Sequence, residues 1–232
     1  MKKHNLGASA RGTVLRCALS LLAVAAAAKA DSFLITFDAG DPIGGLAVNT
    51  VLSNQYAATT GATFSPNAFT GSGWATNTDM RIVSSTSLNA GILGGPALVS
   101  GNILRNFQGW LAENGNASFL ITFANPIISF SADFAGVAPL SLIEIRAFNG
   151  SSLLGSVSLN GSATGQERLS LSGLGNITSV AVIPGNFFDW VGVDNIAFST
   201  PTPTGVPEPS AAALWLGTGL ATLAGLRHRR NR

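Results

Sequence analysis

Carboxylates are the side chains in the central part of this chain that are best suited to bind a metal ion. Asp38 and Asp41 follow a predicted first strand, and Asp194 and Asn195 lie in a predicted last strand. First and last strands often neighbour each other in β-sandwich folds, and clustered oxygen ligands suit Ca²⁺. These four residues form a candidate calcium site. The alternative is that the aspartates make Asx-turns and structural hydrogen bonds.

Large amphipathic aromatic residues are the second set of candidates. Exposed tryptophan faces stack on sugar rings, and Trp74 lies in a Gly/Ser/Asn-rich loop where exposure is expected. The candidate carbohydrate-binding residues are Trp74, Trp110, Trp190 and Tyr56. The alternative for each of them is packing in the core, which is the more common position of a tryptophan.

Glutamates could supply the paired carboxylates of a glycan hydrolase or lyase, and Glu113, Glu144 and Glu167 are the candidates. Glu144, however, alternates with apolar residues along a predicted strand, where a solvated glutamate needs no catalytic role. Residues 31–205 contain no histidine and no cysteine, which excludes Cys/His zinc sites and Ser-His-Asp or Cys-His catalysis there. We therefore expect a protein that is not an enzyme and requires no cofactor, with calcium as an optional ligand.

The charges of the chain are divided between its ends and its centre. Nine of the 13 basic residues lie before residue 31 or after residue 226. Residues 31–205 hold four arginines and ten acidic residues, a net charge of −6. An acidic domain repels phosphate backbones, so nucleic acid is not an expected partner.

Period-2 alternation of apolar residues dominates from residue 31 onward and predicts strands. The clearest series are Phe33-Ile35-Phe37, Phe119-Ile121-Phe123, Ile128-Phe130-Ala132-Phe134 and Ile143-Ile145-Ala147; further predicted strands are Leu153–Leu159, Glu167–Leu171, Ile177–Ile183 and Val191–Phe198. Gly, Asn and Pro separate them, notably at Asn125-Pro126 and Gly173, and Asn149-Gly150 is a hairpin signal. The predicted fold is all-β, an antiparallel β-sandwich of jelly-roll type over residues 31–199.

The N-terminal segment, residues 1–30, has the order of parts found in a secretory signal peptide. Lys2, Lys3, Arg11 and Arg16 precede an apolar run from Ala18 to Ala28. Ala28 and Ala30 then place small residues three and one positions before a cleavage site, and we predict cleavage before Asp31. The expected partners are the Sec translocon and signal peptidase.

The C-terminal segment has three parts in order after a Thr/Pro linker at 200–205. Val206, Pro207, Glu208 and Pro209 are followed by an apolar stretch at 211–226 and then by a basic tail with Arg227, Arg229, Arg230 and Arg232. The stretch of 16 residues is about 24 Å long as a helix, which is short but sufficient for a transmembrane helix with snorkelling arginines. The basic tail is expected to stay cytoplasmic.

These parts resemble the PEP-CTERM sorting signal of Gram-negative bacteria, over residues 206–232. The resemblance implies that exosortase recognises the motif and removes the tail, after a transient stay in the inner membrane. It also implies a final location at the cell surface or in the extracellular matrix. A plain tail anchor is the alternative.

The central residues are similar in style to galactose-binding-like and carbohydrate-binding jelly-rolls. The resembling motifs include Ile35-Thr36-Phe37-Asp38, Gly61-Ala62-Thr63-Phe64 and Val193-Asp194-Asn195-Ile196. The leading hypothesis is a non-catalytic surface or matrix protein that binds or embeds in exopolysaccharide. The alternatives are a structural or adhesive protein with protein partners, and a carboxylate-dependent glycan hydrolase or lyase.

Overall fold

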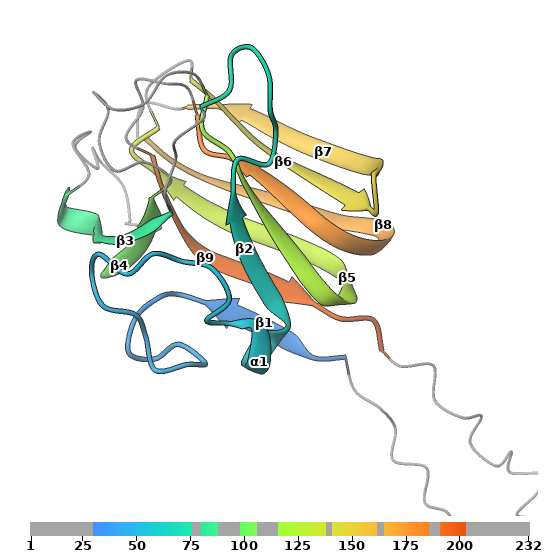
Figure 1. Ribbon diagram of the computed structural model, residues 1–232, viewed down its shortest axis with the longest axis horizontal. Coiled ribbons are helices and arrows are strands. Elements are labelled where there is room, and N and C mark those ends of the chain that lie inside the picture. Colours follow the sequence, from blue (N-terminus) through green and yellow to red (C-terminus); the bar gives the residue numbers. More distant parts are fainter. Residues whose placement is uncertain are drawn as a thin grey trace, which may run out of the picture. The chain divides into compact units, whose positions relative to one another are not determined.

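The computed structural model describes residues 30–75, 80–87, 98–105, 116–137, 141–161, 165–185 and 191–202 (Figure 1). Residues Ala30–Thr202 form one compact unit, whose fold is described below. Residues 1–29 of the predicted signal peptide (1–30), the predicted sorting motif, the predicted transmembrane helix and the basic tail lie outside the described residues. Within the described ranges, no helix combines the length and apolar composition needed to cross a membrane.

The described residues form nine strands and two short helical turns. In chain order these are β1 (Ser32–Ile35), α1 (Ala57–Thr60), β2 (Ala62–Pro66), β3 (Arg81–Ser84), η1 (Ser85–Ser87), β4 (Asn102–Arg105), β5 (Phe119–Ala135), β6 (Leu142–Asn149), β7 (Ser152–Asn160), β8 (Gln166–Ile183) and β9 (Gly192–Ser199). All pairs of these named strands are antiparallel, and their order is β3-β4-β9-β5-β8-β6-β7, with β1 on β9 and β2 on β5. The prediction of an all-β antiparallel fold is confirmed.

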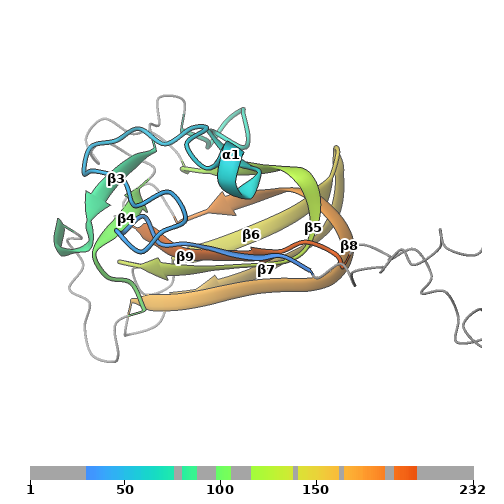
Figure 2. The same cartoon turned by 90° about the horizontal axis from the view of Figure 1, so that it is seen from below.

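Two long strands, β5 and β8, bend and carry the sheet from one layer into a second (Figure 2). On one side of the bend they continue into β2, β6 and β7. On the other side they continue through β9 into β1, β4 and β3. Phe123, before the bend in β5, contacts Phe130 after it and Phe198 of β9, with ring centroids 6.4 and 4.9 Å apart. The main core therefore lies between the two layers, as in a β-sandwich.

The predicted alternation identifies the inward side chains of most strands. Phe119, Ile121, Ile143, Ile145 and Ala147 are all fully buried. Burying these side chains removes about 25 cal/mol of unfavourable hydration for each Å² of apolar surface, which explains why the alternating residues form strands at this core.

The series predicted from Ile128 is wrong at its first member. The pairing of β5 with β8 shifts register between Thr122 and Ser129. As a result Ile127 is buried, whereas Ile128 is 36% exposed.

Two predicted strand breaks are also wrong, for a related reason. Asn125-Pro126 lies inside the continuous strand β5, and Gly173 lies inside β8. Gly173 and Gly175 have φ values of 73° and 82°, which glycine adopts without steric cost. The residues that indicated strand ends instead bend two strands that continue. The hairpin predicted at Asn149-Gly150 is present between β6 and β7.

A small second core covers one end of the outer face of β5 and β9, where "outer" means the side turned away from the main core. It consists of Val99, Ile103 and Ala135, with Val83 and Leu98 packed against them. The segment from Leu98 through β4 therefore covers the Ala135 end of this outer face. The opposite end, around Ser129, has half-exposed or exposed residues.

Candidate functional site

The predicted calcium residues lie around the turn that follows β1. Both carboxylate oxygens of Asp41 already accept hydrogen bonds from protein groups there. Its Oδ2 accepts hydrogen bonds from the N–H groups of Thr36 and Phe37 at 2.8 and 2.9 Å, and from the Tyr56 hydroxyl at 3.0 Å. Its Oδ1 accepts the N–H of Ile43 at 3.2 Å. Asp41 thus stabilises the chain reversal after Phe37, whose φ is 60°.

Asp38 and Asp194 hold the segment around Ser100 against the end of β9. Asp38 Oδ1 accepts the N–H of Asn102 at 2.8 Å, and Asp194 Oδ2 accepts the N–H of Ser100 at 3.3 Å. A Cβ at Gly101 would overlap the Asp38 carboxylate, which would have to move to admit any larger residue. These contacts are structural hydrogen bonds of the kind that the alternative interpretation expected.

Asn195 completes the cluster at a β-bulge. It has a φ of 47°, and the pairing of β5 with β9 shifts register beside it. Its Nδ2 donates to Leu98 O at 2.7 Å and to Asp133 Oδ2 at 3.0 Å. Asp133 is fully buried and also accepts two hydrogen bonds from Arg168, at 2.5 and 2.6 Å. Sequence analysis did not single out Asp133 or Arg168.

The electrostatics of the cluster follow from its burial. Burial raises the pKa of Asp194 to about 7; the Asn195 and Ser100 N–H groups lower it, and the nearby charges of Asp38 and Asp133 raise it. Among the described residues, no group of three or more His, Cys, Asp or Glu side chains is arranged to hold a metal ion. Calcium binding at Asp38, Asp41, Asp194 and Asn195 stays a prediction.

The aromatic candidates lie in different surroundings. Tyr56 is fully buried, and its hydroxyl donates to Asp41, so its ring is not accessible to a sugar. The prediction that Tyr56 stacks on a sugar is therefore wrong. Burial, together with the nearby charge of Asp41, raises the pKa of the Tyr56 hydroxyl. Trp110 and Trp190 lie outside the described residues.

Trp74 belongs to a half-buried stack beside β6. Its ring lies 4.9 Å from that of Phe69, and the Arg146 guanidinium lies 4.9 Å from the Phe69 ring. Arg146 donates to both carboxylate oxygens of Glu144 at 2.8 Å. The structure thus gives Glu144 an ion-pair partner on its own strand, and Trp74 stays a predicted sugar-stacking residue. Glu113 lies outside the described residues.

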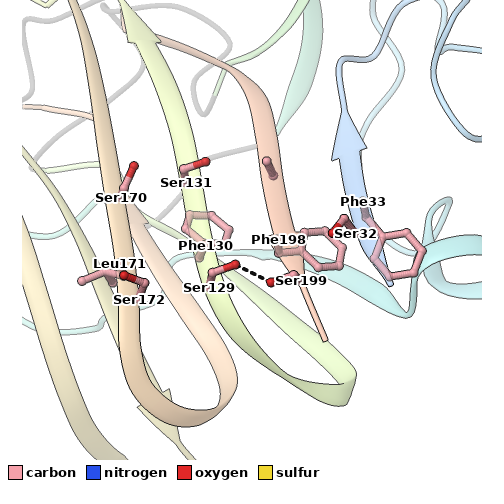
Figure 3. Close-up of a pocket in the computed structure, with 11 residues that line it drawn as sticks. Ser32, Phe33, Ser129, Phe130, Ser131, Ser170, Leu171, Ser172, Phe198 and Ser199 are labelled. Atoms are coloured by element: carbon pink, nitrogen blue, oxygen red, sulfur yellow. Dashed lines mark hydrogen bonds between the residues drawn. The ribbon is translucent and has the colours of Figure 1, made fainter. Parts of the chain in front are cut away.

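A row of serines crosses the open end of the outer face. Ser32 of β1 pairs with Ser199 of β9, Ser199 pairs with Ser129 of β5, and Ser129 pairs with Ser172 of β8. Figure 3 shows this row across four strands, with the Ser129 and Ser199 hydroxyls hydrogen-bonded at 2.5 Å. A second row beside it contains Ala197, Ser131 and Ser170. We call these six serines the serine face.

The serine face lines an open groove of about 320 Å³ (Figure 3). Its other lining residues are Phe33, Phe130, Leu171, Ala197 and Phe198. Within the part of the chain that the structure describes, no charged side chain lines it. The groove is therefore rich in hydroxyl groups, which can each donate one hydrogen bond and accept others.

Sequence analysis missed the serine face, although part of the signal is in the sequence. Ser129-Phe130-Ser131 and Ser170-Leu171-Ser172 both alternate serine with an inward apolar residue. What aligns them is the register of β5 with β8 and β9, and residues of one strand do not determine this register.

Comparisons with known proteins are distant. No protein-family model matches the chain, and no curated protein matches it. Among solved structures, the K2 cleaved adhesin domain of Lys-gingipain has a TM-score of 0.44 and 12% identity, over 72% of this chain and 99% of that chain. The K1 cleaved adhesin domain of Lys-gingipain from Porphyromonas gingivalis W83 has a TM-score of 0.40 and 9% identity, over 74% and 99%. A family 11 carbohydrate-binding module from Clostridium thermocellum, in complex with a mixed-linked tetrasaccharide, has a TM-score of 0.33 and 14% identity, over 66% and 96%. These likenesses are too distant to carry function, which must be inferred from the residues of this chain.

Proposed function

We propose that this chain is an exported, non-catalytic surface or extracellular-matrix protein that binds or embeds in exopolysaccharide through its β-sandwich. The observation that carries the proposal is the serine face, six hydroxyl groups that line one groove on four adjacent strands. The groove is the proposed binding surface.

Serine hydroxyls are suited to a ligand that is itself covered with hydroxyl groups. Each can accept from a sugar hydroxyl, and each except the donor of the Ser129–Ser199 hydrogen bond can also donate to one. A short side chain on a strand loses little rotamer freedom on binding. A single hydrogen bond of this kind adds only about 1 kcal/mol. A polymer that occupies grooves on many copies of the protein gains from avidity, so weak contacts are sufficient in a matrix.

The proposed location rests on the two terminal segments of the sequence. Residues 1–30 resemble a signal peptide read by the Sec translocon and signal peptidase, and residues 206–232 resemble a tail read by exosortase. Together they support passage through the inner membrane and delivery to the surface or matrix of a Gram-negative bacterium, where polysaccharide is abundant.

An adhesive protein with protein partners is the second candidate, and strand β7 favours it. Among the described strands β7 pairs only with β6, so its other edge is open to strand addition. Ser152–Asn160 has no charged residue, and Leu153 and Leu159 are 57% and 42% exposed. An uncharged edge with exposed leucines is a typical place for another protein to pair.

The test is an array of soluble and insoluble polysaccharides probed with the full chain as its native host produces it, with and without calcium. We expect retention on at least one polysaccharide. No retention on any of them, together with altered cell aggregation in a deletion strain, would exclude polysaccharide binding and favour the adhesive function.

A further inference from the structure

The groove of the serine face has an unusual property for the surface of an acidic domain, namely that none of the described residues that line it is ionisable. Residues 31–205 carry a net charge of −6, yet the eleven lining residues are serine, phenylalanine, leucine and alanine. The charged pair Asp133 and Arg168 lies two residue pairs beyond Ser131 and Ser170 along β5 and β8. Arg168 is 58% exposed and donates to both oxygens of the fully buried Asp133, so the pair carries no net charge.

We infer that the groove takes a neutral polysaccharide, lying across the strands, and rejects acidic polysaccharides. This inference rests on the proposed function and adds the chemical class and direction of the ligand. It is carried by the lining of the groove and by the alignment of its serines.

The direction follows from the register of the strands. Ser32, Ser199, Ser129 and Ser172 are direct cross-strand partners, so their backbone positions follow one another at the strand spacing of about 4.8 Å and span about 14 Å. Along a strand the next outward hydroxyl, as from Ser170 to Ser172, is about 6.8 Å away. The row across the strands is thus the longer and denser line of hydroxyls, and a glycan chain laid along it meets one serine per strand.

The preference for a neutral chain follows from charge. A uronate or sulfate group in this groove would lose hydration without gaining a cationic partner from the lining residues. It would also enter the field of a domain with excess negative charge. A neutral sugar loses much less hydration, and its hydroxyls find partners in the serines.

The experiment is affinity electrophoresis of the chain as its native host processes it, in gels that contain a mixed-linkage β-glucan, a galactomannan or polygalacturonate. The processed chain is used because the nine basic residues of the two terminal segments would by themselves bind polygalacturonate. The test variant is Ser170→Ala/Ser172→Ala, which removes two exposed hydroxyls of the groove. The matched control is Ser156→Ala/Ser158→Ala, which removes two exposed hydroxyls at the same spacing on β7. Thermal unfolding of each variant confirms that it is folded.

We expect retardation by at least one of the two neutral polysaccharides, equal at about 20 mM and about 500 mM NaCl because no ion pair contributes. The test variant should bind at least about fivefold more weakly and the control within about twofold of the original chain.

Three results would overturn the inference, and they differ in what they mean for the proposed function. Salt-sensitive retardation by polygalacturonate alone would mean an acidic ligand, with polysaccharide binding retained. Equal binding by the test variant would place a neutral glycan elsewhere on the domain. Retardation by none of the three, with self-association that the test variant abolishes, would mean that the serine face binds a second copy of the chain, and the proposed function would fail with the inference.

Discussion

Burial of the Asp194 carboxyl group makes the stability of the fold depend on pH. Its pKa rises from 3.8 to about 7 on folding. Between these values the folded protein holds a proton that the unfolded chain has released, so the free energy of unfolding falls as pH rises, by up to about 4 kcal/mol. Asp194→Asn is neutral at every pH and should flatten this decrease. Urea unfolding between about pH 4 and about pH 7 measures it.

Asp31→Asn is the control for this prediction, because Asp31 is exposed. It should keep the pH profile of the original chain. If Asp194→Asn keeps that profile as well, the dependence on pH comes from other groups.

Calcium can be tested at the same residues. A Ca²⁺ ion bound by Asp38 and Asp194 would stabilise the folded state in proportion to its concentration relative to its Kd. Added calcium would then raise the unfolding midpoint of the original chain, and chelator would reverse the rise. The rise should be absent from Asp194→Asn, which lacks one carboxylate charge. An unchanged midpoint would show that hydrogen bonds alone explain the cluster.

Gly101 is the residue on which the Asp38 contact depends. Gly101→Ala would push the Asp38 carboxylate off the Asn102 N–H and would also place alanine at a φ of 65°. We expect a loss of about 2 to 3 kcal/mol in the free energy of unfolding. Gly44→Ala separates the two effects, because Gly44 has a φ of 82° but open space around it. Equal losses in denaturant unfolding would mean that the Asp38 contact contributes nothing.

At the scale of elements, the bends of β5 and β8 decide the architecture. Gly175 has a φ of 82° and nothing within 4 Å of an added Cβ, so Gly175→Ala tests the backbone conformation alone. We expect a loss of about 1 kcal/mol. Gly40→Ala, in open space without a left-handed φ, should cost less. The unfolding midpoints of the two variants measure these losses. A lower midpoint for Gly40→Ala than for Gly175→Ala would contradict the role of the bend.

The strands themselves were more predictable than their connections. Alternation identified the buried faces around Ile121 and Ile145, because burial acts on each strand separately. It failed at Ile128, where pairing with β8 shifts the register, and at Gly173, where a breaker bends a strand. It could not reveal that Ser129, Ser172 and Ser199 meet, since this depends on three strands at once. The same reason explains why the groove was missed.

For the whole molecule, the proposed location depends on processing of the chain at its two ends. Intact-mass and terminal-peptide mass spectrometry on fractions of the native host should find a form that begins at Asp31 and ends near Val206-Pro207-Glu208-Pro209. Both trimmed ends are expected because the first and last segments resemble targeting signals, while Ala30–Thr202 forms the compact unit. In the mature form, the loss of nine basic residues leaves an acidic domain, which suits a neutral matrix polymer better than an acidic one. A full-length C-terminus retained in the inner-membrane fraction would instead indicate a tail-anchored periplasmic domain, and the serine face would then meet periplasmic rather than matrix ligands.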